Sequence, residues 1–423
     1  MGDFLRVLAR IMAGRDAVHC DGRSGSPSVA VGSPDHALHS GDAPLVAGPP
    51  ESGRQVGRPQ NRCGRPLLAT RTRLVLRRTE EPSLMALTII DGIEAGRVLS
   101  RADAEGLMEE LLCGRLTTPE IVRLLTAMNA RPVQVKELAG FATAMRRHAG
   151  KPFAAGEAIP QRLVDTCGTG GKTTGTFNIS TAAAIVASAA GARVAKHGNR
   201  GMSSRSGSAD VLEALGVRVD IPIARHGQAI REIGIGFLFA QMAHTSMRHA
   251  VEARKQIGVR TVFNLLGPLT NPAGARFQVV GVPSTELVDV MAATLAELGT
   301  ERAFVVHGAG GLDEISLAGE TVVAEVKKGT LKRFTVTPED FGARRSPLET
   351  VAGGTPQENA VAIRRVLDGE AGPKRDIVVI NAAAALATTG AAPDFRSGAE
   401  LASQVLRSGA AKEKLESLVT FTK

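Results

Sequence analysis

The segment from residue 165 to residue 210 contains glycine, hydroxyl and basic residues in a pattern that is typical of an anion-binding site. It begins with DTCGTGGKTTGTFNIST, continues through an alanine-rich run and ends with AKHGNRGMSSRSGSAD. Glycines at 168, 170 and 171 allow the backbone to turn sharply and to expose its N–H groups. A glycine-rich loop alone is often only a turn, so this loop by itself leaves both interpretations open.

The residues after the glycine loop predict the N-terminus of a helix. Asn178, Ser180 and Thr181 come directly before the apolar run 182–190. Short polar side chains are favoured at this end of a helix, where unpaired amides and the helix dipole attract a phosphate group. The first loop and this helix together therefore indicate a phosphate site.

A second loop of the same kind follows the alanine-rich helix. The turn KHGNR, residues 196–200, comes after a strand-like stretch at 192–195, and a serine-rich loop with glycine runs from 201 to 208. Lys196 is either a solvated lysine or a point charge for a pyrophosphate group, and its place at a strand end within a polar loop favours the second. Two such loops are hard to explain by packing, and they predict a ligand with several phosphates.

Asp313 and Glu314 lie in a Gly-Gly-Leu turn after a predicted strand that ends at Val306. Magnesium prefers hard oxygen ligands and often takes one or two carboxylates together with substrate phosphates. The alternative is an ordinary acidic surface turn. Beside two phosphate loops, the pair predicts a magnesium site.

Arg254 lies on a predicted helix together with Met247 and Val251. It forms either a surface ion pair with Glu252 or a neighbouring residue, or a bidentate contact between its planar guanidinium and the carboxylate of a ligand. Two histidines of the same stretch, His244 and His249, are expected to pack or to line a pocket rather than to transfer protons.

Two domains must position these residues. Helical periodicity at 102–112, from Thr118 onward and at 133–148 predicts a small all-helical domain over residues 85–150, which part of the segment 236–268 rejoins. In the remainder, residues 160–423, short β-branched runs alternate with alanine-rich helices. Expected strands are 193–195, 217–220, 278–282, 303–306 and 377–380. This alternation predicts a larger α/β domain with a mostly parallel central sheet, where ligands bind at the carboxyl ends of strands.

The first 84 residues differ from the rest in composition. They are rich in Gly, Pro, Ser and Arg, and they contain no Lys. Such a segment buries too little apolar surface to offset its ordering entropy, so we expect a mostly disordered extension that is dispensable for activity. Its end, RTRLVLRR, is either a contact for nucleic acid or a membrane or, as we expect, a solvated tail.

Composition narrows the classes of function and the compartment. The chain has 423 residues, a formal charge of +9, 13 Phe and neither Trp nor Tyr. Base-stacking surfaces for single-stranded nucleic acid normally need more aromatic residues. The four cysteines form no CxxC pair, which favours a reduced, cytoplasmic setting over a disulfide scaffold or a zinc site. We expect no membrane span, because the apolar runs are too short, and no signal peptide, because Arg6 and Arg10 interrupt the apolar stretch 1–13 and no cleavage context follows.

The ordered series GTGG…TFNIST, AKHGNR…SGSAD, RTVFNLLGPLTNPA and GLDEIS resembles the anthranilate phosphoribosyltransferase family over residues 87–420. The resemblance implies transfer of the phosphoribosyl group of 5-phosphoribosyl 1-pyrophosphate to the amine of anthranilate, the second step of tryptophan synthesis from chorismate. It implies Mg²⁺, an active site between the two domains and a homodimer through the helical domains. No nucleic-acid or membrane partner is expected.

The resemblance also implies roles for individual residues. The phosphoribosyl pyrophosphate would be bound by residues of the two loops and the helix between them: Gly168, Gly171, Lys172, Thr176, Asn178, Ile179, Ser180, Thr181, Lys196, Ser203, Ser204 and Ser208. Metal-associated residues would be Ser180, Asp313 and Glu314. Anthranilate would contact Gly168, Asn199 and Arg254, with Gly267 and Pro268 walling its pocket.

The chemistry requires little of a protein base. As the bond from C1 to pyrophosphate stretches, positive charge develops on the ribose and negative charge develops on the leaving group. A metal ion, Lys196 and helix-end amides are suited to stabilise that negative charge. His197 is the one candidate for handling the amine proton, and the alternative is that it only holds its loop.

Two positions depart from the family pattern. Lys172 stands where the family commonly has Asp, which replaces an acidic neighbour of the metal–phosphate site with a cation. The stretch His244–Met247 lacks the proline that is usual in this turn.

Two rival functions stay open. One is a pyrimidine nucleoside phosphorylase of the same architecture, which needs no carboxylate contact such as that of Arg254. The other is a nucleic-acid-binding relative without catalysis.

Overall fold

A computed structural model describes residues 84–170, 175–201 and 205–423. The predictions for the N-terminal extension therefore concern residues outside the described part, except for Leu84 at its edge. Within the described ranges, none of the helices combines the length and the apolar character that a bilayer-crossing segment needs.

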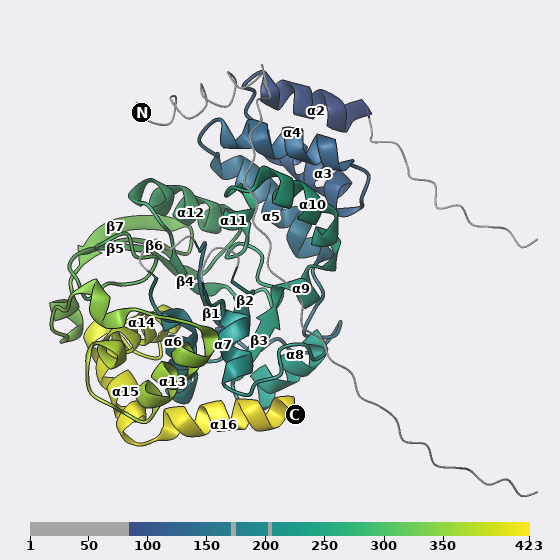
Figure 1. The fold of residues 1–423 in the computed structure, drawn as a ribbon. Helices are drawn as coiled ribbons and strands as arrows, with labels where there is room; N and C mark the ends of the chain where they lie inside the picture. Colours follow the sequence, from purple (N-terminus) through teal and green to yellow (C-terminus); the bar gives the residue numbers. More distant parts are fainter. Residues whose placement is uncertain (1–83, 171–174, 202–204) are drawn as a thin grey trace, which may run out of the picture. The chain divides into compact units, whose positions relative to one another are not determined.

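Four helices form the helical part of the fold: α2 (Leu84–Glu94), α3 (Arg101–Leu112), α4 (Thr118–Asn129) and α5 (Val135–His148). Helix α4 begins where the sequence predicts, because Thr117 and Glu120 form a capping box and Pro119 stands in the first turn. Helix α10 (Val251–Ile257) packs against α4, and its buried Ala253 belongs to the same apolar cluster as the four helices. Figure 1 shows α10 beside these helices, far along the chain from them.

The other part is built on a seven-stranded sheet in the order β3-β2-β1-β4-β5-β6-β7. Strands β1 to β5 run parallel, and β6 and β7 extend the sheet as antiparallel strands. The structure thus confirms a helical domain and an α/β domain with a mostly parallel sheet. The strands are β1 (Val164–Gly168), β2 (Val194–Gly198), β3 (Ile235–Phe239), β4 (Phe277–Gly281), β5 (Arg302–Gly308), β6 (Thr321–Lys327) and β7 (Thr330–Val336).

Helices cover both faces of the sheet (Figure 1). On one face, Val279 and Phe304 pack in a cluster with α6 (Ile179–Ala189) and α14 (Pro373–Thr389). On the other, Val280 and Val305 pack with α12 (Thr285–Glu297) and the helical domain. Alternate strand residues thus enter the two cores, as buried parallel strands require. The remaining helices are α7 (Ser208–Ala214), α8 (Ile223–Glu232), α9 (Ala240–Ala243), α11 (Phe263–Leu266), α13 (Pro356–Leu367), α15 (Phe395–Arg407) and α16 (Ala410–Thr422).

Two predicted strands are wrong. Residues 377–380 lie inside α14, where the apolar run continues into Ala382–Ala387 and is buried on all sides. A short β-branched run cannot be distinguished from a fully buried helix by periodicity. Residues 217–220 form no strand, although Val217 and Val219 are buried, because the neighbouring backbone N–H of Arg218 donates to Thr422 Oγ1 of α16 rather than to a strand.

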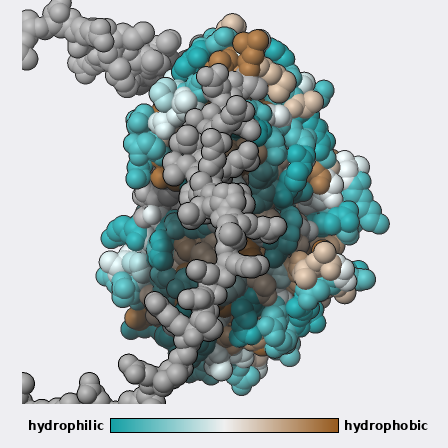
Figure 2. Space-filling model, turned by 90° about the vertical axis from the view of Figure 1, so that its right-hand side faces the viewer, coloured by the Kyte–Doolittle hydropathy of each residue, from teal (hydrophilic) through white to brown (hydrophobic). Residues whose placement is uncertain are grey.

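Exposed apolar side chains gather on the outer side of the helical domain. Leu84 and Met85 on α2 and Val251 on α10 are all largely exposed, as is Val259 just after α10. Figure 2 shows apolar residues at the end of the molecule where α2 lies, within a visible surface that is otherwise mostly hydrophilic.

Candidate active site

A cavity of about 300 Å³ lies at the carboxyl ends of the central strands. From β1 the chain continues to β2 on one side, whereas β4 and β5 lie on the other, so the cavity sits at the topological switch point of the sheet. Segments of the α10–α11 region complete its wall. The described site residues that line it are Gly168, Thr176, Asn178, Ser180, Thr181, Lys196, His197, Asn199, Ser208, Arg254, Gly267, Pro268, Asp313 and Glu314.

The acidic pair is packed directly against the ends of β1 and β4. Asp313 and Glu314 are only 4% and 5% exposed, which contradicts the alternative of an acidic surface turn. A Cβ on Gly168 would lie 2.6 Å from Asp313 Oδ2, and one on Gly281 would lie 1.6 Å from the Asp313 backbone oxygen. Glycine at both strand ends therefore leaves the room that Asp313 needs to pack there.

A buried polar layer holds the basic turn in place. Asp165 on β1 is fully buried and accepts hydrogen bonds from the His197 backbone N–H (3.0 Å) and from Asn271 Nδ2 (2.9 Å). Lys196 donates from Nζ to the Thr166 backbone oxygen at 2.5 Å. Burial raises the pKa of Asp165, although nearby Lys196 opposes this shift. The sequence predicted that Lys196 and His197 follow the strand, but both belong to β2 itself. The reason is that parallel pairing with β3 continues through Gly198.

His197 is buried and has a defined tautomer. Its Nδ1–H donates to the Gly267 backbone oxygen at 3.1 Å, which leaves Nε2 as an acceptor without a hydrogen-bond partner among the described residues. Burial lowers the pKa of His197 to about 3, and the ring of His244, 5.1 Å away, adds to this shift. The imidazole is therefore neutral near pH 7.

The thiol of Cys167 lines the same cavity. Burial raises its pKa well above the ordinary value, and the neighbouring Asp165 carboxylate adds to this shift. A thiolate is the reactive form of cysteine, so this residue is a packing residue and no nucleophile near neutral pH.

The serine loop is bound to the N-terminus of α6 through Ser206. Asn178, the N-cap residue of α6, donates from Nδ2 to the Ser206 backbone oxygen and accepts at Oδ1 from the Ser206 hydroxyl. Its side chain makes no capping bond to the helix. Thr181 in the first turn is buried, and its hydroxyl has no partner in the described part of the chain. This helix end thus faces the cavity with polar groups available to an anion.

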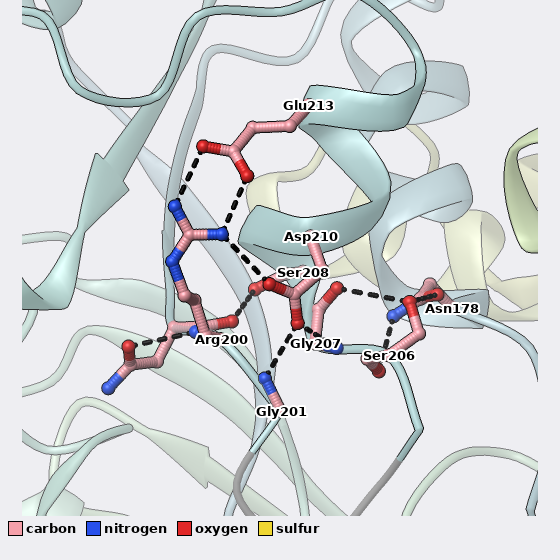
Figure 3. A network of polar contacts seen from close by, with 9 residues as sticks. Asn178, Arg200, Gly201, Ser206, Gly207, Ser208, Asp210 and Glu213 are labelled. Carbon is pink, nitrogen blue, oxygen red and sulfur yellow. Dashed lines mark hydrogen bonds and ion pairs between the residues drawn. The ribbon is translucent and has the colours of Figure 1, made fainter. Parts of the chain in front are cut away.

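Asp210 in the first turn of α7 fixes both ends of the serine loop (Figure 3). Its Oδ2 accepts hydrogen bonds from the backbone N–H groups of Gly201 and Gly207, each at 2.9 Å. Its Oδ1 pairs with Arg200 at 3.0 Å, and Arg200 is also bound by both oxygens of Glu213. These bonds hold the pKa of Asp210 below its usual value despite partial burial.

Two arginines approach the cavity from the segment after β3. Arg254 on α10 lines it, with its guanidinium carbon 5.5 Å from the centre of the Phe263 ring, and burial lowers its pKa. This contradicts an exposed ion pair with Glu252. Arg260 donates to the backbone oxygens of Gly170 (2.6 Å) and Thr169 (3.2 Å), so it braces the glycine loop from outside.

Most of the predicted residues that can be placed converge on one cavity. Ile179 is the exception: its side chain lies in the core, it does not line the cavity, and its N–H donates to the Phe177 oxygen at 2.7 Å. Gly171, Lys172, Ser203 and Ser204 lie outside the described residues. Sequence reasoning missed the supporting residues Asp165, Asp210, Arg260 and Asn271. All four lie in the motif strings, but no local pattern reveals that they act across loops.

Comparisons with known proteins agree with this geometry. Two family profiles match the chain: the helical bundle domain of a glycosyl transferase family over residues 87–149, and the a/b domain of a glycosyl transferase family over residues 160–412. The anthranilate phosphoribosyltransferase of Pelotomaculum thermopropionicum is 49% identical over 338 residues, which cover 80% of this chain and 97% of that protein. The chain belongs to the anthranilate phosphoribosyltransferase family.

Solved structures of the family share the fold. The anthranilate phosphoribosyltransferase of Thermus thermophilus superposes with a TM-score of 0.74 at 46% identity, over 79% of this chain and 98% of that chain. The Saccharomyces cerevisiae enzyme, solved with PRPP and Mg, gives 0.72 at 28% identity, over 80% and 98%. It has also been solved with 4-fluoroanthranilate, with a TM-score of 0.71 at 27% identity, over 80% of this chain and 97% of that chain.

Proposed function

We propose that this protein transfers the phosphoribosyl group of 5-phosphoribosyl 1-pyrophosphate to the amine of anthranilate, yielding N-(5-phosphoribosyl)anthranilate and pyrophosphate. This is the second step of tryptophan synthesis from chorismate. The observation that carries the proposal is the single cavity in which two phosphate loops, a buried acidic pair and Arg254 meet. A nucleoside phosphorylase would not need Arg254, and a non-catalytic nucleic-acid binder would not need the acidic pair.

The donor would bind through the two loops and the N-terminus of α6. Thr176, Asn178, Ser180 and Thr181 present hydroxyl and amide groups at that helix end, and Lys196 lines the same cavity. These hydrogen-bond donors and the lysine charge thus lie at the end of α6 where the helix dipole also favours a phosphate. Gly168, Gly171, Lys172, Ile179, Ser203, Ser204 and Ser208 complete the proposed donor-binding set.

Magnesium would be held by Asp313 and Glu314 together with Ser180. Both carboxylates are buried and line the cavity, and hard oxygen donors are the ligands that Mg²⁺ prefers. When bound, the ion supplies charge neutralisation for the departing pyrophosphate. The solved yeast enzyme contains PRPP and Mg, which supports the same cofactor here.

Lys172 gives this metal site a specific test. A cation in place of the usual Asp would contact pyrophosphate directly and lower the magnesium requirement. Activity measured against Mg²⁺ concentration should then shift to higher concentrations in Lys172→Asp. Identical curves for the variant and the parent chain would count against this role.

Anthranilate would enter between Arg254, Asn199 and the wall formed by Gly267 and Pro268. The Arg254 guanidinium would bind the carboxylate in a bidentate manner and orient the amine toward the ribose. His197 Nε2 faces no protein donor among the described residues, so it can accept a hydrogen bond from the amine as the new C–N bond forms. With a pKa of about 3, His197 is suited to orient the amine more than to remove its proton.

We also propose a homodimer formed through the exposed apolar side of the helical domain. Leu84, Met85 and Val251 on this side would be covered by a second copy. Sedimentation analysis should find a dimer for the parent chain and a monomer for Met85→Glu combined with Val251→Glu.

We also propose a cytoplasmic location, which is consistent with the free thiols of Cys113 and Cys167.

We also propose a division into an N-terminal extension (1–84), a helical domain (85–150, joined by part of 236–268) and an α/β domain (160–423). Deleting residues 1–84 should leave the steady-state kinetics nearly unchanged. A large loss of turnover would contradict the dispensable extension.

The function is tested by mixing the protein with anthranilate, the phosphoribosyl donor and Mg²⁺ and following anthranilate fluorescence. The signal should fall only when all components are present. Salt-sensitive retention on DNA without a fluorescence change would instead support the nucleic-acid binder.

A further inference from the structure

A second group of chemically reactive side chains lies on the helical domain, outside the cavity. In the described part of the chain, one set of three His, Cys, Asp or Glu residues places its potential ligand atoms within 4.8 Å of one another: Glu109, Cys113 and His148. Glu109 and Cys113 are four residues apart at the end of α3, so they lie on the same side of that helix. His148 is the last residue of α5, which packs along α3 (Figure 1).

The three potential ligand atoms lie near one another, but their separations differ from those of a metal-bound tetrahedral set. His148 Nε2 lies 2.6 Å from Glu109 Oε1, and Cys113 Sγ lies 3.8 Å from the same oxygen. Around Zn²⁺, the bond lengths for oxygen, nitrogen and sulfur ligands imply ligand-to-ligand separations of roughly 3.3–3.6 Å. Rotamer adjustments of about 1 Å in these side chains would therefore suffice to place an ion between them.

Neighbouring charge already orients the carboxylate. Arg147 donates to Glu109 Oε2 at 3.2 Å and also pairs with Glu105. Arg147 thus binds one oxygen of Glu109 while the other, Oε1, faces His148 and Cys113. Such a second partner fixes the direction of a ligand and is common behind metal-binding carboxylates.

The group is accessible from water. The side chains of Glu109 and His148 are 29% and 24% exposed, and Cys113 is exposed. An ion can therefore reach the three ligand atoms without opening the core, and a water molecule can complete the fourth position.

We propose that Glu109, Cys113 and His148 form a binding site for one divalent transition-metal ion of the Zn²⁺ or Co²⁺ class. A thiolate and an imidazole are soft or borderline ligands, which select such ions and not Mg²⁺. Binding releases the Cys113 thiol proton to solvent and leaves His148 neutral, coordinated through Nε2. The ion ties the end of α3 to the end of α5. The simpler alternative is an ion pair between Glu109 and His148 with Cys113 as a bystander.

The test is titration of the metal-free full chain, without an affinity tag, with Co²⁺ as the probe. The parent chain should bind one ion with a near-ultraviolet thiolate-to-cobalt absorption band, and Zn²⁺ but not excess Mg²⁺ should abolish it. The band should be lost in Cys113→Ser and strongly weakened in His148→Gln. Because Cys20, Cys63 and Cys167 also carry thiols, the difference spectrum between the parent chain and Cys113→Ser assigns the band.

His249→Asn is the matched control. His249 packs against Gly114, next to Cys113, but is not one of the three ligands. This variant should keep the band and the stoichiometry of the parent chain. A band that persists in Cys113→Ser, disappears equally in His249→Asn or never forms would overturn the proposal. Circular dichroism of each variant separates a lost ligand from a lost fold.

Discussion

Replacing Asp210 with Ala should loosen the serine loop and weaken binding of the phosphoribosyl donor. The Asp210 carboxylate accepts two backbone N–H bonds, from Gly201 and Gly207, which flank residues 202–204. Hydrogen bonds to charged groups contribute about 1.5–3 kcal/mol each, and the lower value applies here because the Asp210 side chain is 20% exposed. Loss of both bonds therefore costs about 3 kcal/mol.

If the loop must be ordered when the donor binds, the same free energy appears in the affinity. About 3 kcal/mol corresponds to a rise of up to about 100-fold in the dissociation constant of the donor. Titration calorimetry with 5-phosphoribosyl 1-pyrophosphate at saturating Mg²⁺ measures this change directly. Asp210→Asn retains an acceptor oxygen without the charge, so its effect should be intermediate.

Glu213→Gln provides the control for this experiment. It removes the negative charge of a partner of Arg200 on the same helix but leaves both N–H bonds to Asp210 intact. As a partly exposed ion pair, it should contribute only about 0–1 kcal/mol. Unchanged donor affinity in Asp210→Ala, or an equal loss in Glu213→Gln, would refute the reasoning that Asp210 organises the loop for the donor.

Three further predictions concern the acceptor pocket, the helical domain and acid stability. Arg254→Lys should raise KM for anthranilate about 10-fold or more in steady-state assays while donor affinity stays unchanged, because it loses the bidentate contact. Glu137 is fully buried, pairs with the partly exposed Arg131 and accepts hydrogen bonds from two backbone N–H groups. Glu137→Ala should therefore lower the free energy of unfolding in urea by about 3 kcal/mol, and an unaltered transition would contradict this structural role. Burial lowers the pKa of His197 to about 3 and those of His226 and His244 to about 4, so below pH 6.5 the unfolded chain binds more protons. Stability should thus fall with decreasing pH by about 1.4 kcal/mol per unit for each of these histidines until its folded-state pKa is reached, and His226→Gln should remove the contribution of one histidine from this slope.

The sequence by itself determined the phosphate-binding character of the loops. Glycine at 168, the polar residues at the start of α6 and the pair Asp313–Glu314 are local signals, because backbone freedom and helix capping act over a few residues. For the same reason the starts of α3 and α4 and the strands β2, β4 and β5 were predicted near their observed positions. Four motifs in one order were enough to indicate the family.

Only the tertiary structure decided how these signals meet and what supports them. The apolar run at 377–380 became helix because packing on all sides suits a buried helix as well as a strand. Asp165 and Asn271, 106 residues apart, form one hydrogen bond, and Arg260 reaches the glycine loop 90 residues earlier. Burial of Asp313, Glu314 and His197 likewise follows from the packing of strands that are distant in the chain. Contacts of this kind depend on chain topology, and a local pattern of residue types carries no information about them.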